Sequence, residues 1–443
     1  MRFWAVTAQF IFAPLAIIAS SSVSAQEAPQ ADLEQLSRNL EDAETSFQYA
    51  RAAAAAGDTK AAIAALERVL QINPDLANIK LELGLLYLRV GQADLARSYL
   101  EAAVNAPDAP PDARIRARQA LRTAEGNLST LRLAGFLSSG VQYQSNPNGS
   151  PDFVSVQPQL GNVSPIILSG DDLTIPRGGD FSFNLSGNLE AAVGLGGQAG
   201  HELVLDGYAS QNWYRDETDI DLTYLQGRFG PRFNLGGATS STGLVRPYVL
   251  GTLLSLGGDR YYGSVGGGAD LLFRTGLTTS VAIEGRYEDR TYRNSTLRGA
   301  ASDQSGDYWT GQVQGTWQFQ PRTRLIGNVN GQIVDADRAY QSRKSGAAQI
   351  GLGHVFAPPV GTLAWYLSGS FGYRYTRYEE PDTLVDRDTR RQEDRFDVAL
   401  ALSIPLNASL ALDARFQHTW NRANLPNYDY NNVSGLFGVT ARF

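Results

Sequence analysis

The sequence predicts an α+β chain of two domains, an N-terminal α-solenoid followed by a fourteen-stranded antiparallel transmembrane β-barrel. Three observations predict this division. The hydrophobic period is helical up to residue 125, it changes to two from Leu131 onward, and the alternating segments run for ten residues or more. A tilted strand needs about 9–11 residues to cross a membrane, whereas strands in soluble proteins average about 5–6. We therefore expect a leader at 1–25, a helical domain at 26–125, a hinge at 126–130 and the barrel at 131–443.

The composition of the chain excludes several function classes. Its 443 residues carry a formal net charge of −7 without a basic cluster, so nucleic acid is not expected as a partner. The chain contains no cysteine, which excludes disulfides and thiol catalysis, and its three histidines have no metal-ligand spacing. No catalytic or phosphate-binding motif occurs, so we expect neither an enzyme nor a bound cofactor.

Residues 1–25 have the pattern of a secretory signal peptide. Arg2 supplies the positive end, Phe10–Ala19 forms a short apolar core, and Val23–Ala25 is a small-residue cleavage site. A membrane anchor is the alternative, but the apolar run is too short to span a bilayer and contains Pro14. We expect the protein to be exported, with the periplasm as its first destination.

Residues 31–125 contain two units of a helical repeat. Gly57 and Gly91 lie 34 residues apart, which is the period of the tetratricopeptide repeat (TPR). The positions that carry this resemblance are small residues at helix crossings, large residues that fill the layers, and helix breakers: Gly57, Ala62, Pro74, Leu83, Gly84, Tyr87, Gly91 and Ala96. The resemblance implies a concave groove for a peptide or partner protein, and a passive spacer is the alternative.

Two stacked repeats leave apolar surfaces at both ends, so a further helix is expected to cover each end. The segment Asp32–Ala43 can cover the first repeat. The segment Asp112–Ala124 can cover the second, with Asp112 as its N-cap because Ala109–Pro111 breaks the chain just before it.

The alternating part of the chain divides into fourteen strand candidates. The clearest runs from 277 to 292, where Val281 and Ile283 share one face and Glu284 and Arg286 the other. The candidates are 131–145, 181–194, 201–214, 220–235, 244–256, 260–273, 277–292, 307–320, 323–335, 345–356, 362–378, 395–404, 408–420 and 432–443. The connections between them tend to alternate between short and long, as they do in membrane barrels. An even number of strands returns the chain to the side on which it started, where the helical domain is expected.

The last strand, Asn432–Phe443, ends on an aromatic residue and is apolar on one face. This ending resembles the sorting signal of bacterial outer-membrane barrels, with Phe437, Val439 and Phe443 as its signal residues. The resemblance implies that outer-membrane lipid and the barrel assembly machinery are partners. It also implies an outer-membrane location with the TPR domain in the periplasm.

If the apolar face meets lipid, the other face of each strand lines the lumen. The charged residues expected there have both signs: Glu190, Asp206, Arg228, Arg232, Glu284, Arg286, Glu288, Arg290, Arg324, Arg374, Arg395, Asp397, Asp413 and Arg415. Such charges usually pair with one another, and a water-filled conduit for a polar substrate is the sharper hypothesis. Since neither sign dominates in the sequence, we expect no ion selectivity. Whether the loop 146–180 enters the lumen stays open.

The layout of leader, short TPR domain and C-terminal barrel resembles the surface lipoprotein assembly modifier (Slam) family. The first strand, Gly135–Asn148, is similar to that family's first strand because it runs into an asparagine-rich loop. The resemblance implies a factor that helps deliver a lipoprotein or soluble protein client to the cell surface. The TPR groove would engage the client or a periplasmic chaperone, and the barrel would give the path. The alternatives are an exopolysaccharide export channel and a passive porin with a periplasmic TPR tether.

Overall fold

The structure is a computed structural model. It describes residues 43–55, 57–106, 109–128, 131–158, 164–169, 178–195, 201–235, 243–274, 278–359, 361 and 363–443. The expected leader at 1–25 lies outside the described residues, and so does the first expected capping helix, apart from Ala43. No helix among the described residues is long and apolar enough to cross a membrane.

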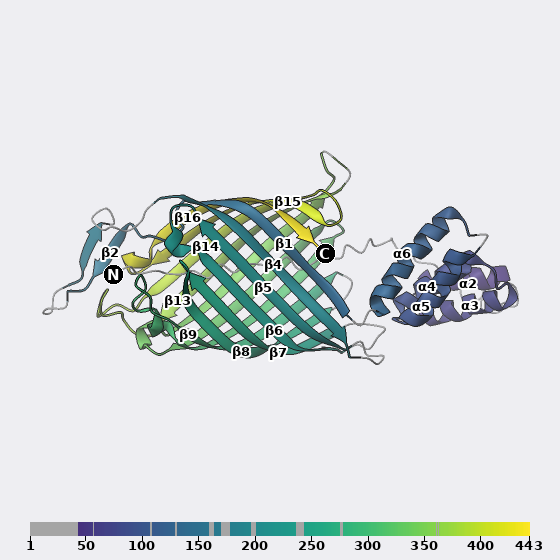
Figure 1. Ribbon diagram of the computed structural model, residues 1–443, viewed down its shortest axis with the longest axis horizontal. Helices are drawn as coiled ribbons and strands as arrows, with labels where there is room; N and C mark the ends of the chain where they lie inside the picture. The colour runs from purple at the N-terminus through teal and green to yellow at the C-terminus, as the bar shows by residue number, and fades with distance from the viewer. Residues whose placement is uncertain are drawn as a thin grey trace.

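Within residues 43–128, the described N-terminal part contains two antiparallel helix pairs and one further helix (Figure 1). The helices are α2 (Ala43–Ala55), α3 (Thr59–Ile72), α4 (Ala77–Arg89), α5 (Ala93–Asn105) and α6 (Pro111–Leu128). Gly57 and Gly91 stand at equivalent turns with φ values of 85° and 78°, a conformation that glycine adopts without steric cost. The predicted repeat of helix, glycine turn and helix is therefore present twice.

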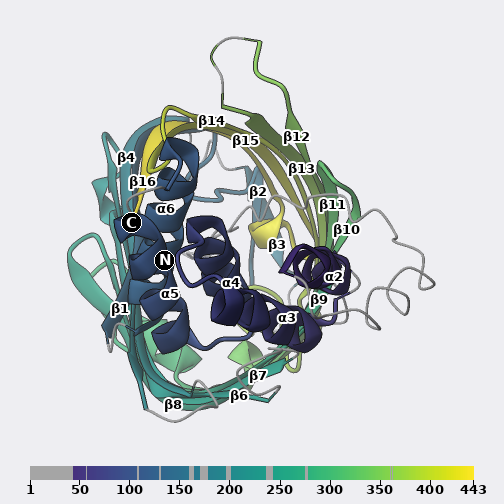
Figure 2. The same ribbon diagram turned by 90° about the vertical axis from the view of Figure 1, so that its right-hand side faces the viewer.

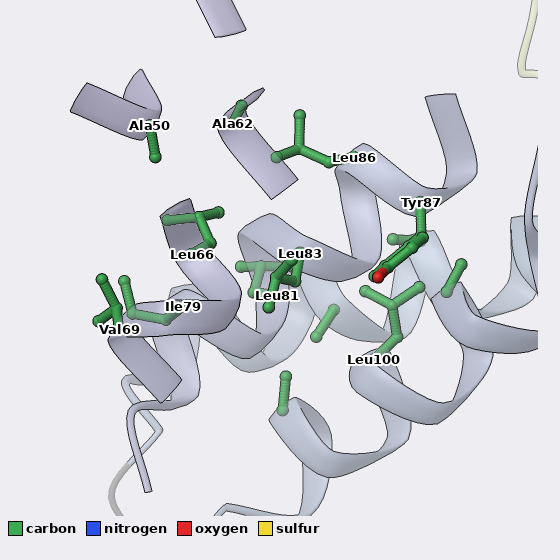
Figure 3. Packing of buried hydrophobic residues seen from close by; sticks show 14 of the residues in the cluster. Ala50, Ala62, Leu66, Val69, Ile79, Leu81, Leu83, Leu86, Tyr87 and Leu100 are labelled. Atoms are coloured by element: carbon green, nitrogen blue, oxygen red, sulfur yellow. The ribbon is translucent and has the colours of Figure 1, made fainter. Parts of the chain in front are cut away.

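The core of this domain lies where the helix pairs cross (Figure 3). Ala62 and Ala96, which occupy equivalent positions in the two repeats, are fully buried, as are Leu83 and Leu100. Gly84 permits the close crossing of α4 and α5, because a Cβ atom at this position would lie only 2.5 Å from Leu100 Cγ. The small residues of the repeat thus determine how closely the helices approach.

The start and end of α6 differ from the sequence prediction. The helix begins at Pro111, so Asp112 lies inside its first turn and is not the N-cap. Proline suits this first position because its missing N–H would have no helical partner there. The helix also continues to Leu128, which leaves only residues 129–130 of the expected hinge, and these lie outside the described residues.

The C-terminal part is a closed antiparallel barrel of fourteen strands, as predicted (Figures 1 and 2). The strands are β1 (Leu131–Gln144), β4 (Asp180–Gly194), β5 (Glu202–Tyr214), β6 (Leu222–Asn234), β7 (Gly243–Leu256), β8 (Asp259–Arg274), β9 (Thr279–Tyr292), β10 (Gly306–Gln320), β11 (Thr323–Ala336), β12 (Arg343–Phe356), β13 (Trp365–Tyr378), β14 (Gln392–Pro405), β15 (Leu410–Ala423) and β16 (Tyr430–Arg442). The first and last strands close the barrel, with a register from Phe136↔Arg442 to Gln144↔Ser434.

The two ends of the barrel differ. We call the end where β1 begins and β16 ends the near mouth, and the opposite end the far mouth. In the described parts of the connections at the far mouth there are four 3-10 helices: η2 (Thr218–Ile220), η3 (Ala301–Gln304), η4 (Ala339–Gln341) and η5 (Pro426–Tyr428). The connection from β1 to β4 forms a hairpin there, made of β2 (Phe153–Val156) and β3 (Ile166–Ser169). The sequence prediction missed this hairpin because four residues are too few to display a period of two.

The outer face of the barrel is apolar. Large side chains that would be buried in a soluble protein stand exposed on it, for example Val249 (63%), Val265 (67%), Val329 (61%) and Phe437 (63%). Their neighbours across the ladders point to the same side, so the apolar surface continues around the barrel. An exposed apolar surface of this extent suits a lipid bilayer and not water.

Replacing Gly84 by valine tests the close helix crossing. The valine side chain would collide with the buried Leu100, so we expect the helical domain to lose about 1–3 kcal/mol of unfolding free energy. Circular dichroism at a helix wavelength during thermal unfolding of the full chain measures this. The control Ser98→Ala changes an exposed residue of α5 and should leave the transition unchanged. Equal transitions in both variants would contradict the close-crossing explanation.

Candidate functional site

The candidate site is the inner face of the barrel. Residues opposite each other across a ladder point to the same side, and the ladders connect Glu190 to Asp206 and Asp206 to Arg228. Followed around the barrel, the registers put all fourteen charged residues expected in the lumen on the same face, opposite to the exposed apolar one. They do not form one cluster. We call the inner face of β4–β9 the paired wall and that of β10–β16 the open wall.

The paired wall carries two groups of ion pairs, one around Arg232 and a larger one that extends from Asp206 to Arg290. Arg232 reaches Glu190 and Glu202, both at 2.8 Å, and Arg228 reaches Asp206 at 2.9 Å. Further along the same face, Arg286 and Arg290 contact Glu288 at 3.1 and 2.9 Å. The remaining links within this wall join Arg246 to Asp206 and Asp270, Arg228 to Asp270 and Glu284, and Arg286 to Glu284. Arg132, in the neighbouring strand β1, pairs with Glu202 and Glu190.

Several of these ion-paired side chains are buried, which indicates that the pairs stabilise the wall. The side chains of Glu288 and Arg246 are only 2% and 7% exposed, and Tyr248 and Leu250 are buried between them on the same face. A buried carboxylate is tolerated only when cations and hydrogen bonds compensate for its lost hydration. Glu288 has two arginines and also accepts a hydrogen bond from Ser264 Oγ at 2.7 Å. This interpretation agrees with the simpler sequence hypothesis that lumen charges pair with one another.

The open wall is mostly uncharged and polar. Amide and hydroxyl side chains cover the inner face of β10–β13: Thr310, Gln312, Gln314, Thr316, Asn328, Asn330, Gln332, Ser345, Gln349, Ser368, Ser370 and Thr376. Some bond to each other across strands, such as Gln332 Nε2 to Thr310 Oγ1 at 3.2 Å and Gln349 Nε2 to Ser370 Oγ at 3.2 Å. Such groups can both donate and accept hydrogen bonds to a passing polar molecule.

The charged residues of the open wall lie mainly on β13–β15. Arg395 binds both oxygens of Asp397, at 2.9 and 3.0 Å, and Asp397 also accepts from Thr419 Oγ1 at 2.6 Å. Arg374 stands directly across the ladder from Arg395. Arg415 is exposed although it lies on the inner face, which shows that the lumen beside it holds solvent.

Two other predicted residues of this wall lie apart from that group. Arg324 donates to Tyr366 Oη at 3.2 Å and stacks on its ring, and Asp413 lies opposite Ser403. Among the residues that the structure describes, no three histidine, aspartate or glutamate side chains are grouped to hold a metal ion.

The sequence prediction missed several members of the inner face. Glu202, Arg246 and Asp270 complete the paired wall but were not named. Strand alternation could have found Glu202, which lies four residues before Asp206 and therefore on the same face. Arg343 was missed because the strand was expected to begin at residue 345.

The connections at the far mouth pack against one another. Ser155 in β2 exchanges backbone hydrogen bonds with the Asn427 side chain, at 2.8 and 3.0 Å, and its hydroxyl donates to Val385 O at 3.0 Å. Val385 is fully buried against Leu425 and Tyr428. The described part of the 146–180 loop therefore packs on neighbouring loops at this end (Figure 1).

Cations and tyrosines continue this packing onto the inner rim of the far mouth. Arg391 lies 3.2 Å from the ring centroid of Tyr428 and 4.4 Å from that of Tyr378, and it pairs with Glu393. Burial raises the pKa of Tyr428 to about 12 and raises that of Asp382 in the adjacent loop above its usual range. The Tyr428 hydroxyl thus stays protonated at neutral pH, which suits its place in a packed interface.

The two remaining sets of predicted residues do not line the lumen. In the helical domain, Leu83 and Tyr87 are core residues and Pro74 lies in an exposed turn. Tyr87 donates to Glu67 and stacks on Tyr99, and burial raises its pKa. Phe437 in β16 is 63% exposed and Val439 shares its face of the strand, while Phe443, which directly follows β16, is 66% exposed.

Removing one carboxylate from each wall tests the division of the inner face. Glu288→Gln removes the buried carboxylate that Arg286 and Arg290 share and leaves Arg286 with Glu284, so we expect a loss of about 3–5 kcal/mol in unfolding free energy. Asp413→Asn, on the open wall, should change it by no more than about 0.5 kcal/mol. Urea unfolding in micelles, followed by tryptophan fluorescence, measures both. Equal losses would show that the two walls do not differ in this way.

The TPR prediction agrees with the comparison to protein families, because the tetratricopeptide repeat family matches residues 53–121. No curated protein matches the chain. The comparisons do not name the surface lipoprotein assembly modifier family, so that resemblance remains a prediction.

Solved structures resemble each part of the chain separately. A bacterial polysaccharide outer membrane secretin is 8% identical, with a TM-score of 0.37, over 70% of this chain and 98% of its own. The outer membrane channel DcaP of Acinetobacter baumannii is 11% identical, with a TM-score of 0.38, over 71% of this chain and 97% of its own. A tetratricopeptide repeat domain protein from Salinibacter ruber is 22% identical, with a TM-score of 0.19, over 20% of this chain and 91% of its own. At scores this low, these likenesses carry no argument about function.

Proposed function

We propose that this protein is an outer-membrane conduit that helps deliver a lipoprotein or soluble protein client to the cell surface. The helical domain, in the periplasm, engages the client or its chaperone, and the barrel gives the path. The observation that carries this proposal is the solvent-accessible polar open wall, enclosed by an apolar exterior, in the same chain as a TPR domain. A wall of this kind suits passage of a polar molecule through an apolar layer.

The short link between the two domains supports a role for the helical domain at the near mouth of the barrel. Helix α6 ends at Leu128 and β1 begins at Leu131, so two residues connect them. Such a link spans about 10 Å at most, because each residue extends the chain by about 3.3–3.6 Å. A client bound by the helices is therefore held beside the near mouth, where its effective concentration at the lumen is high.

The packing of the connections at the far mouth favours a conduit that a client opens over a passive porin. Three connections interlock there through Ser155, Asn427 and Val385, and the last of these is fully buried. In this proposal, these connections separate when a folded or extended protein leaves the barrel. A passive porin has no need of such an interlock.

A second candidate function is export of a polysaccharide. The amide and hydroxyl groups of the open wall favour it, because sugar hydroxyls both donate and accept hydrogen bonds. Under this alternative, the helical domain would recruit the synthesis machinery and not a protein client.

Deleting the helical domain while keeping the leader and barrel tests the proposed role. Cells that carry the barrel alone should lose one or a few proteins from the surface and retain them in the periplasm, because nothing holds the client at the near mouth. Protease shaving of intact cells with quantitative proteomics measures this. The Gly84→Val variant provides a milder form of the same defect.

Two controls separate the candidates. The amount of folded barrel in the membrane must match the full-length protein, which an unheated gel shows. If cells that carry the barrel alone have a normal surface proteome but less extracellular polysaccharide, the exported substrate is a polysaccharide and not a protein client. A normal surface proteome together with steady ion conductance of the full chain in planar bilayers would indicate a porin.

A further inference from the structure

The open wall carries more positive than negative charge. On the inner face of β11–β15 the basic residues are Arg324, Arg343, Arg374, Arg395 and Arg415, and the acidic residues are Glu393, Asp397 and Asp413. Five arginines stand against three carboxylates, an excess of two positive charges. The fourteen residues expected in the lumen have the same excess, eight arginines against six carboxylates, and the registers place this excess on the open wall.

Three of these arginines gather around Asp397, and a second carboxylate, Glu393, interacts electrostatically with two of them, Arg374 and Arg395. Arg395 binds Asp397 through two nitrogens, while Arg374, across the ladder from Arg395, interacts electrostatically with both of them. Arg415 donates to Gln417 Oε1 at 3.0 Å, and Gln417 in turn donates to Asp397 at 3.2 Å. We call Arg374, Arg395, Arg415 and Asp397 the arginine cluster.

The arginine cluster differs from the ion pairs of the paired wall. There, carboxylates such as Glu288 and Asp206 each contact two arginines, and arginines such as Arg228 each contact two or more carboxylates. In the cluster, two arginines face each other across a ladder, an arrangement that like-charge repulsion disfavours. Arg415 is exposed to the lumen, so its charge is accessible to solvent, and Arg374 and Arg395 are partly exposed.

We propose that the arginine cluster is an anion-binding site on the open wall. It binds a carboxylate, sulfate or phosphate group that belongs to the molecule passing through the lumen. Guanidinium groups suit such ligands because their planar N–H donors match the oxygen pairs of these anions. The proposal rests on the proposed function only in treating the barrel as a conduit. It replaces the expectation of a lumen without charge preference.

The absence of cysteine from the chain makes a direct test possible. Ala399, half-buried on the inner face between Arg395 and Arg415, is replaced by cysteine in the full chain. Its reaction rate is compared between a methanethiosulfonate reagent that bears a sulfonate and one that bears a trimethylammonium group. The matched control is Ser186→Cys, which lies on the inner face opposite Ser138 and Ser210. Each rate is divided by that of a free peptide thiol.

A positive site should favour the sulfonate reagent at position 399 by about tenfold relative to position 186, and added salt should reduce this preference. Adding Arg374→Gln and Arg415→Gln should abolish the preference, while Arg415→Lys, which keeps the charge, should retain most of it. Equal ratios at the two positions, or no reaction with either reagent at position 399, would overturn the proposal. An unheated gel verifies that each variant is folded. The assay needs no client, so its result is independent of the surface-delivery experiment.

Discussion

Closure of the barrel is the constraint on which the rest of the structure depends. In an apolar layer every backbone N–H and C=O must find a partner within the protein, and a sheet with a free edge cannot meet this requirement. Here β16 pairs with both β15 and β1, and the chain ends with Phe443, whose N and O exchange hydrogen bonds with Gly135 at 3.1 and 2.9 Å. The last residues therefore complete a cylinder that all earlier strands require. Because the strand number is even, closure also keeps the helical domain and the C-terminus at the same mouth.

Once the barrel is closed, the period of two directs alternate side chains of every strand to lipid and to the lumen. The polar and charged side chains of the inner face must then find partners among themselves or in water. The paired wall does so with long side chains of opposite charge, which reach across neighbouring strands and bury one another. The open wall does so with shorter amides and hydroxyls, which leave space for water next to Arg415. One half of the cylinder is thus thickened by its own side chains, while the other half keeps the lumen accessible.

Features with a local cause could be predicted from the sequence, and those set by register could not. All fourteen barrel strands were located to within three residues, because alternation is a property of each segment alone. Gly57, Gly91 and the helix pairs followed from the spacing of the repeat. Which charges meet, such as Arg232 with Glu190 and Glu202, depends on registers between strands. The same holds for the contact of β2 with Asn427, which joins residues 272 positions apart.

The barrel strands and the connections at the far mouth differ in how freely they can change shape. The strands cannot separate in an apolar layer without exposing backbone groups, and the paired wall adds buried ion pairs to that restriction. The connections at the far mouth lie beyond the ladders and are held by side-chain contacts, such as those of Ser155, Val385 and Tyr428. Separating these contacts leaves the ladder hydrogen bonds of the strands intact. The arginine cluster lies on β13–β15, so the strand registers determine its position and the connections at the far mouth do not.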